Sequence, residues 1–317
     1  MLARLILLPL ALLLMGNAPA PSPWLTLDQL KAKYQDSQSH YATIAGLKVH
    51  YKDEGLKGPD APVLLLVHGS SSTLRTWDGM VPLLKPHYRV IRYDVPGLGL
   101  SDDVPDSVVA STAPADIAEA LLTQLGIKKV TVVGVSSGGT LGVFLAAKRP
   151  DLVERLVISN APSDPVDTSH LVLTKAWTDA QARAKAQGYQ DADYWSQFLT
   201  FFAGDGSRID QPTRLHFYDF NRRTAHKNFI AMIAKVADAP KARAAMAAVK
   251  APTLLIWGGS DALLPPRAGR TLYGYLANAE PALVYLPDVG HFPPIETPKR
   301  FTAIMRAWIE DGVPSRK

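Results

Sequence analysis

The chain has 317 residues, of which 47% are hydrophobic and 20% are charged, and its formal net charge at pH 7 is +5. This composition supports a large folded core and excludes a globally disordered chain, while the absence of any dense basic run argues against a nucleic-acid-binding protein. There are no cysteines, which excludes disulfides, thiolate catalysis and metal sites with cysteine ligands.

The first 20 residues have the three-part composition of a secretory signal. Arg4 supplies a positive charge, residues 5–15 form an apolar run, and residues 16–20 are small residues with an A-x-A pattern. The apolar run is shorter than the roughly 20 residues that span a bilayer. We therefore predict export to the periplasm or the medium. Because Pro21 disfavours cleavage after Ala20, the alternative is an uncleaved segment that associates with a membrane through residues 5–15.

The chain then alternates apolar strands with helices. A helix over 27–34 is followed by a hairpin over 41–51, and further strands are expected at 63–67, 88–93, 130–133, 153–159, 253–257 and 283–286. Helices are expected at 77–84, 114–125, 140–149, 267–276 and 298–309. This alternation predicts an α/β fold with a mostly parallel eight-stranded sheet flanked by helices.

Residues 164–240 interrupt the alternation and contain no clean strand. They are rich in alanine, glutamine, lysine and aromatic residues, and the aromatic residues include Trp177, Tyr189, Tyr194, Trp195, Phe198, Phe201, Phe202, Phe217, Tyr218 and Phe220. We predict that this segment is a helical cap inserted into a core made of residues 21–163 and 241–317. Most of the aromatic side chains are expected to pack the cap, and a few to line a binding pocket.

The carboxyl ends of the strands carry the polar loops. His68-Gly69-Ser70, Asp94-Val95-Pro96-Gly97, Ser136-Ser137-Gly138, Gly258-Gly259-Ser260-Asp261 and Asp288-Val289-Gly290-His291 each follow an apolar strand. Because function in such sheets sits at the carboxyl ends of the strands, Ser136, Asp261 and His291 are predicted to meet at one sheet edge. Gly134-Val135-Ser136-Ser137-Gly138 is a G-x-S-x-G pattern between a strand and a helix, which is typical of a nucleophile elbow with Ser136 at its tip.

Together these five loops resemble the α/β-hydrolase fold superfamily over residues 41–312, in a serine-nucleophile, esterase-like form with a cap. The order Ser…Asp…His is also that of the superfamily. The resemblance implies a catalytic triad in which Ser136 attacks, His291 moves the proton and Asp261 orients His291. It also implies an oxyanion hole formed by the backbone N–H groups of Ser70 and Ser137.

Several residues have alternative interpretations. In some members of the superfamily the acid follows the preceding strand, where Asp164 and Asp167 lie. Asp94 and Ser101 match a structural turn, and His68 is expected to hold the oxyanion loop rather than act as a base. Ser70-Ser71-Ser72 replaces the glycine run of some lipases and esterases, and its hydroxyls are expected to shape this loop rather than to add donors to the oxyanion site.

A serine at the elbow argues against haloalkane dehalogenases and epoxide hydrolases, which use aspartate there. Val135 and Trp77 are expected in the substrate pocket, and Val135 makes it more apolar. No H-E-x-x-H motif or cluster of metal ligands occurs in the sequence, so no metal or other cofactor is expected.

These features predict an exported serine hydrolase that acts on a small-molecule carboxylic ester with an apolar acyl or aryl group. Hydrolysis of a lactone or of a C–C bond, or perhydrolysis, is an alternative on the same triad. A non-catalytic small-molecule receptor is the alternative from another class.

Overall fold

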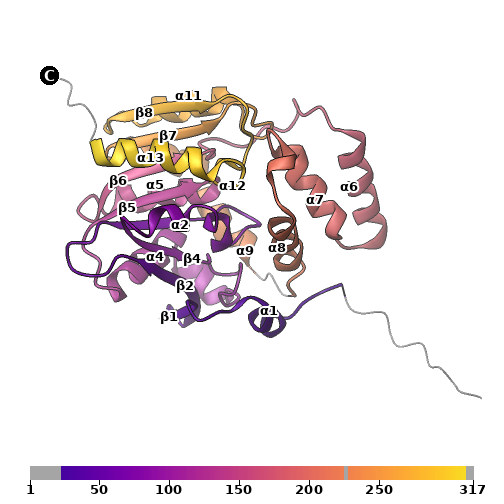
Figure 1. Cartoon of the computed structure of the whole chain (residues 1–317), viewed down its shortest axis with the longest axis horizontal. Helices are drawn as coiled ribbons and strands as arrows, with labels where there is room; N and C mark the ends of the chain where they lie inside the picture. The colour runs from indigo at the N-terminus through magenta and orange to yellow at the C-terminus, as the bar shows by residue number, and fades with distance from the viewer. Residues whose placement is uncertain (1–22, 225–227, 312–317) are drawn as a thin grey trace, which may run out of the picture.

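The computed structural model describes residues 23–224 and 228–311. The predicted signal or anchor, residues 1–20, lies outside the described residues. No helix within the described ranges is long and apolar enough to span a membrane. Figure 1 shows a layered α/β body with a group of helices, α6 to α8, projecting from one edge.

Within the described residues, the strands form one eight-stranded sheet in the order β1-β2-β4-β3-β5-β6-β7-β8. Strand β2 is antiparallel to β1 and β4, and the other neighbours are parallel. This is the predicted α/β-hydrolase sheet. The bounds are β1 (His40–Ile44), β2 (Leu47–Gly55), β3 (Val63–Val67), β4 (Arg89–Tyr93), β5 (Val130–Val135), β6 (Val153–Ser159), β7 (Thr253–Gly258) and β8 (Pro281–Leu286).

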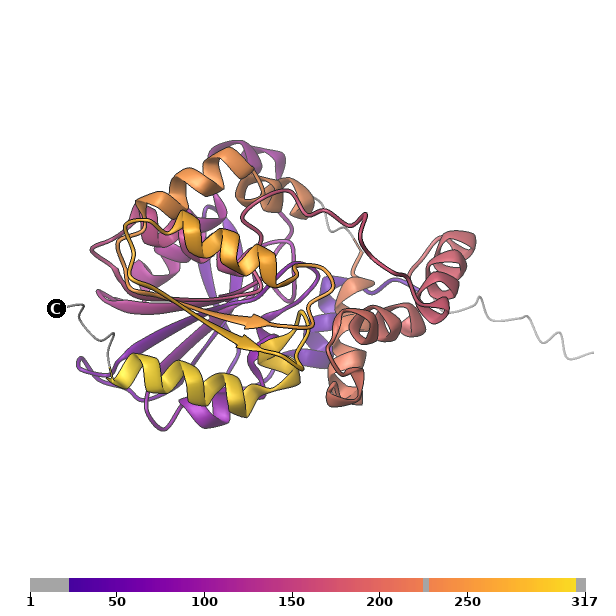
Figure 2. The same ribbon diagram turned by 90° about the horizontal axis from the view of Figure 1, so that it is seen from above.

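Helices cover both faces of the sheet, as Figure 2 shows for the yellow α13 below it and the orange helices above it. The helices outside the predicted cap range, or beginning at its very end, are α1 (Leu27–Tyr34), α2 (Val81–Leu84), α3 (Asp106–Ser111), α4 (Pro114–Gln124), α5 (Ser137–Lys148), α10 (Ala239–Ala248), α11 (Pro266–Tyr275), α12 (Pro293–Glu296) and α13 (Pro298–Asp311). The 3-10 helix η1 (Leu74–Trp77) replaces the start of the helix predicted at 77–84.

The central strand β5 explains why the sheet has two separate cores. All of its side chains are buried. Val130 and Val132 join the core formed with α4, α5 and α11, whereas Val133 and Val135 join the core formed with α2 and α13. A strand covered on both faces must be apolar at every position, and this accounts for its unbroken β-branched run.

The cap consists of α6 (Lys175–Gln187), α7 (Ala192–Phe202), η2 (Gly206–Arg208) and α8 (Gln211–Asn221). The next helix, α9 (Phe229–Val236), belongs to the predicted cap range 164–240 but packs on the core, where Met232 and Val236 join the buried cluster of α4 and α5. The predicted end of the cap at residue 240 is therefore too late, because α9 is apolar on the side that faces α5.

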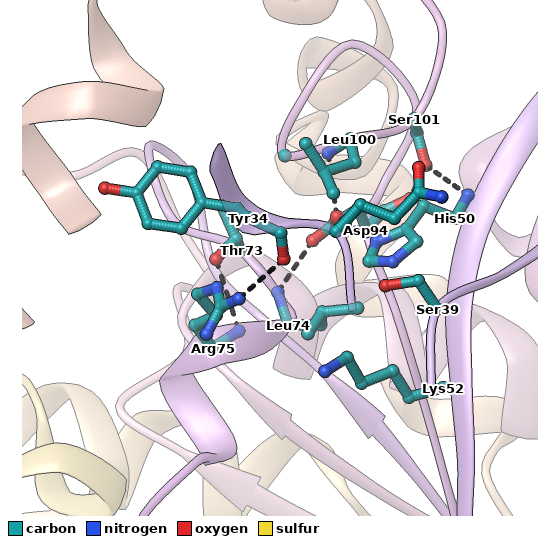
Figure 3. Close-up of polar contacts among 12 residues, drawn as sticks. Tyr34, Ser39, His50, Lys52, Thr73, Leu74, Arg75, Asp94, Leu100 and Ser101 are labelled. Carbon is teal, nitrogen blue, oxygen red and sulfur yellow. Dashed lines mark hydrogen bonds and ion pairs between the residues drawn. The ribbon is translucent and has the colours of Figure 1, made fainter. Parts of the chain in front are cut away.

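Helix α1 fastens the cap to the core. Tyr34 Oη donates to Asp219 Oδ2 of α8 at 2.5 Å, and Lys33 pairs with the same oxygen. Arg75 of η1 donates to the backbone carbonyl of Tyr34 at 2.9 Å (Figure 3). Because Asp219 is fully buried, its carboxylate needs these donors to offset the loss of water. The α8 end of the cap is thus tied to a core element.

Asp94 organises the turn after β4, which the sequence analysis interpreted as a structural turn. Its carboxylate accepts from the N–H groups of Leu74 and Leu100, both at 2.8 Å, and lies 2.7 Å from His50 Nδ1 (Figure 3). Ser101 Oγ donates to the backbone carbonyl of Asp94. Burial alone would raise the pKa of Asp94, but the hydrogen bond and charge of His50 and the Leu100 N–H together lower it.

Replacing Asp94 tests this network. We expect Asp94→Asn to lower the free energy of unfolding by about 3 kcal/mol near neutral pH, because an amide leaves buried donors unmatched. A lowered carboxyl pKa contributes stability above the unfolded value of about 4, and that contribution is lost as the pH falls through the folded value. Urea unfolding of the wild type and of Asp94→Asn should therefore show a difference in the free energy of unfolding that becomes smaller below about pH 4. Asp288→Asn, at an exposed carboxylate, is the control and should change little. A difference in the free energy of unfolding that is the same at all pH values would contradict this account.

Candidate active site

Ser136 occupies a strained backbone position at the turn between β5 and α5. Its φ is 54° and its ψ is −131°, a combination that residues other than glycine seldom adopt. The Ser136 N–H donates to the carbonyl of Ser159 at 2.9 Å, and its own carbonyl accepts from the Gly139 N–H. The turn is thus held from both sides by backbone hydrogen bonds, and its geometry is that of a nucleophile elbow.

Two glycines of the G-x-S-x-G pattern are required by close backbone packing. A Cβ on Gly138 would lie 2.3 Å from the carbonyl oxygen of Val67, and one on Gly134 would lie 2.4 Å from that of Gly138. No side chain fits at either position. Helix α5 therefore begins directly against the end of β3, which places the loop after His68 beside Ser136.

Asp261 and His291 lie together on the loops after β7 and β8. Asp261 Oδ2 lies 2.8 Å from His291 Nδ1, and Oδ1 accepts from the N–H groups of Leu263 and Leu264. The Asp261 side chain is fully buried and that of His291 is 6% exposed. A carboxylate beside Nδ1 stabilises the tautomer with the proton on Nδ1, which leaves Nε2 free to accept a proton.

Asn160 is a residue of the site that sequence reasoning missed. Its amide Nδ2 donates to Asp261 Oδ2 at 2.6 Å, and its Oδ1 accepts from the Gly258 N–H at 3.1 Å. Asn160 is fully buried, and its φ of 44° is tolerated better by asparagine than by most residues. Its position at the end of β6, beside an elbow and an acid-bearing loop, was the only available signal.

The loop after β3 is fixed by His68 and by a pair of hydroxyls. His68 Nδ1 donates to the carbonyl of Gly69 and Nε2 accepts from the Val95 N–H, so the ring is neutral. Burial lowers the pKa of His68, against the opposing charge of Asp94. Ser70 Oγ and Ser137 Oγ are hydrogen-bonded at 2.9 Å, which joins the two loops whose N–H groups were predicted to form the oxyanion hole.

A cavity of about 120 Å³ lies above Ser136 between the core and the cap. Among the described residues, those that line it include no lysine, arginine, aspartate or glutamate; they are Gly69, Ser70, Ser71, Ser72, Thr76, Val135, Ser136, Phe198, Phe217, Leu263, His291, Phe292, Pro294 and Ile295. Of the aromatic residues of the cap, Phe198 and Phe217 line the cavity. Ser136 and His291 open into the same space, whose other walls are mainly apolar.

The structure places the remaining predicted site residues as follows. Trp77 does not line the cavity: it is fully buried in the core with Met80 and Phe301, because η1 turns its ring toward the sheet, and its neighbour Thr76 lines the cavity instead. The prediction for Trp77 was therefore wrong. The alternative acids lie elsewhere, since Asp164 pairs with Arg243 and Asp167 accepts from the Ser169 N–H. Over the described ranges, no group of three or more histidine and acidic side chains could hold a metal ion.

Comparison with known proteins agrees with this architecture. A sequence model described as "alpha/beta hydrolase fold" matches residues 62–298, which is well over half of the chain. The chain belongs to the alpha/beta hydrolase fold family. This alpha/beta hydrolase is similar to the 2-hydroxy-6-oxononadienedioate/2-hydroxy-6-oxononatrienedioate hydrolase of Escherichia coli K12. The two sequences are 28% identical over 82% of this chain and 90% of the relative.

Solved structures show the same fold. The enol-lactonase from Burkholderia xenovorans LB400 superposes with a TM-score of 0.70 at 24% identity, covering 86% of this alpha/beta hydrolase and 100% of that chain. A hydrolase from Pseudomonas aeruginosa PA01 superposes with a TM-score of 0.67 at 26% identity, covering 86% and 98%. These structures share the architecture with this chain.

Substitution of Asn160 tests its place in the site. Asn160→Gly should lower the free energy of unfolding by about 2 kcal/mol, because the Gly258 N–H and the Asp261 carboxylate lose a buried partner, and Asn160→Ala loses the same partner. Alanine should cost about 1 kcal/mol more than glycine, since it has a Cβ at a positive φ. Urea unfolding of the two variants measures the difference, and equal stability would show that the backbone relaxes at this position.

Proposed function

We propose that this alpha/beta hydrolase is a serine hydrolase that cleaves a small, apolar carboxylic ester. The observation that carries the proposal is that the strained Ser136 and the hydrogen-bonded pair of Asp261 and His291 meet at one apolar cavity. A nucleophile, a base with a free nitrogen and a buried carboxylate that orients the base are the parts that acyl transfer requires.

The proposed mechanism has two halves. His291 Nε2 takes the proton from Ser136 Oγ as the oxygen attacks the ester carbonyl, and the imidazolium that forms is stabilised by Asp261. His291 then protonates the leaving alcohol, which departs and leaves an acyl group on Ser136. A water molecule, deprotonated by His291, attacks this acyl-enzyme, and its collapse releases the acid and restores Ser136.

The negative charge that develops on the carbonyl oxygen needs donors that are already in place. We propose that the N–H groups of Ser70 and Ser137 supply them, as the resemblance implied. Ser137 begins the 12-residue helix α5, whose N-terminus favours negative charge. The hydroxyl pair between Ser70 and Ser137 would keep the two donors at a fixed spacing. Loss of one such donor typically raises the barrier by about 3 kcal/mol.

The size and polarity of the cavity limit the substrate. A cavity of about 150 Å³ in another protein binds benzene, so the 120 Å³ here suits an acyl or aryl group of up to about six carbons. A lactone of similar size contains the same ester bond and remains within the proposal. Perhydrolysis differs only in that a peroxide replaces water in the second half.

The second candidate is hydrolysis of a C–C bond. The E. coli relative is named for a substrate that is a dicarboxylate with a keto group, and hydrolysis of such a carbon chain must break a C–C bond. A dicarboxylate calls for cationic side chains, and within the described part of the chain no lysine or arginine lines the cavity. This absence favours the ester over the dicarboxylate.

Export through residues 1–20, or attachment to a membrane through residues 5–15, stays part of the proposal. It rests on the composition of that segment alone.

The nucleophile is tested with a fluorophosphonate probe. The wild-type protein should be labelled on one serine, and Ser136→Ala should abolish labelling because the probe reacts only with an activated hydroxyl. The matched control is Ser72→Ala, which removes another hydroxyl from the cavity wall and should leave labelling intact. Persistent labelling of Ser136→Ala would assign a different nucleophile, and an unlabelled wild type would favour the receptor.

The acid is tested by Asp261→Asn. An amide in this position favours the wrong tautomer of His291, and we expect kcat for a nitrophenyl ester to fall by about 10⁴. Asp164→Asn is the control and should retain near-normal activity, since Asp164 pairs with Arg243. The reverse result would move the acid to the loop after β6.

The size limit is tested at Phe217, which lines both this cavity and a smaller neighbouring one that Arg75, His216 and Phe220 also line. For wild type, kcat/KM should fall for acyl chains longer than about six carbons. Phe217→Ala should raise kcat/KM for longer chains, relative to short ones, by at least about tenfold. Phe201→Ala removes a cap ring that stacks on Trp177 away from the cavity and should keep the wild-type preference. Inactivity across the whole series, with turnover of a keto dicarboxylate, would select the second candidate.

A further inference from the structure

Glu296 is a buried carboxylate that the proposed mechanism does not use. It ends the short helix α12, just after His291, and is 5% exposed. Within the described residues, its hydrogen bonds all come from backbone N–H groups, those of Gly204, Asp205, Gly290 and Phe292. Four N–H donors that converge on one carboxyl group favour a carboxylate at this position, because an ionised acceptor forms stronger hydrogen bonds than a neutral one.

The two oxygens of Glu296 serve two different segments. Oε1 accepts from Gly290 at 3.0 Å and Phe292 at 3.2 Å, the two residues that flank His291. Oε2 accepts from Gly204 at 2.8 Å and Asp205 at 3.3 Å, which follow the cap helix α7. Oε2 also lies 3.2 Å from the Gly290 nitrogen. One side chain therefore ties the loop of His291 to the end of the cap helix.

The two segments also contact each other directly. The His291 N–H donates to the carbonyl of Phe202 at 2.8 Å. A Cβ on Gly290 would lie 2.3 Å from the Gly204 nitrogen, and one on Gly204 would lie 2.7 Å from the Gly290 nitrogen. Only backbone fits between them, so a small shift of the cap helix end must move the His291 loop as well.

The environment of Glu296 combines burial with four hydrogen-bond donors. Burial raises its pKa, and the four N–H groups oppose the rise without cancelling it. A carboxyl with a raised pKa makes ionisation costlier in the folded state, so its charge reduces stability as the pH rises above the unfolded value. The position of the carboxyl group, which joins two separate segments through four N–H groups, is the observation that points to a positioning role.

We propose that Glu296 is a positioning residue that locks the His291 loop against the cap, so that the imidazole stays within reach of Ser136. This inference rests on the proposed function of Ser136 and His291. It makes the position of the end of α7 a condition for a competent base, because the same carboxylate holds both segments.

The test is Glu296→Gln, which keeps the size of the side chain. Its single carbonyl oxygen can serve one segment, while its NH2 group faces the N–H donors of the other. We expect kcat for a short nitrophenyl ester to fall at least tenfold with KM changed less than twofold. Fluorophosphonate labelling of Ser136 should slow by a similar factor, with no matching fall in melting temperature. Glu296→Asp, which keeps both oxygens on a shorter stem, should give a smaller loss of kcat.

Asp288→Asn is the matched control. Asp288 lies on the same loop, and its exposed carboxylate also bridges the cap and the core, through Arg208 of η2 and Arg300 of α13. Exposed ion pairs contribute little, so this variant should keep the wild-type kcat. An equal loss of kcat in Asp288→Asn and Glu296→Gln would overturn the specific role of Glu296.

A measurement without substrate separates this inference from the proposed function. The proton between His291 Nδ1 and Asp261 Oδ2 should give a low-field ¹H NMR signal in wild type that broadens or shifts in Glu296→Gln. An unchanged signal together with unchanged labelling would overturn the inference. If the fluorophosphonate probe does not label the wild type, but the low-field NMR signal of the wild type is lost in Glu296→Gln, only the proposed function is overturned. If Glu296→Gln does not fold, Glu296→Asp decides by the same readouts.

Discussion

The structure depends on the close contact between the start of α5 and the end of β3. Gly138 has no Cβ to keep the helix away from the carbonyl oxygens of Val67 and His68, and Gly134 allows the chain to turn beneath it. This contact holds Ser136 in a strained conformation that an isolated turn would relax. It also brings the Ser70 loop to Ser137, so one packing constraint creates both the proposed nucleophile and its oxyanion donors.

The other half of the site is built from buried polar groups rather than from close packing. Asp261 is satisfied by Asn160, by two N–H groups of its own loop and by His291, so its charge is held without water. Glu296 is satisfied by backbone N–H groups from the cap and from the His291 loop. Because each carboxylate joins separate segments, the loops after β6, β7 and β8 and the end of α7 form one unit.

The cap covers this unit. Phe198 and Phe217 close the cavity from above, while α1 holds α8 through Tyr34 and Asp219. The E. coli relative acts, by its name, on a dicarboxylate, yet the described walls of this cavity carry no basic side chain. Proteins of one fold can act on different substrates, since a few side chains at the site set its polarity without disturbing the sheet.

The sequence by itself determined the sheet, the elbow and the order of Ser136, Asp261 and His291, because apolar strands, glycine turns and polar strand ends are local patterns. Only the tertiary structure decided the roles of Asn160 and Glu296, whose partners lie 101 and 92 residues away in the chain. It also moved Trp77 from the pocket into the core and assigned α9 to the core. A local pattern shows that a side chain is apolar or polar, whereas its partner depends on how distant segments pack.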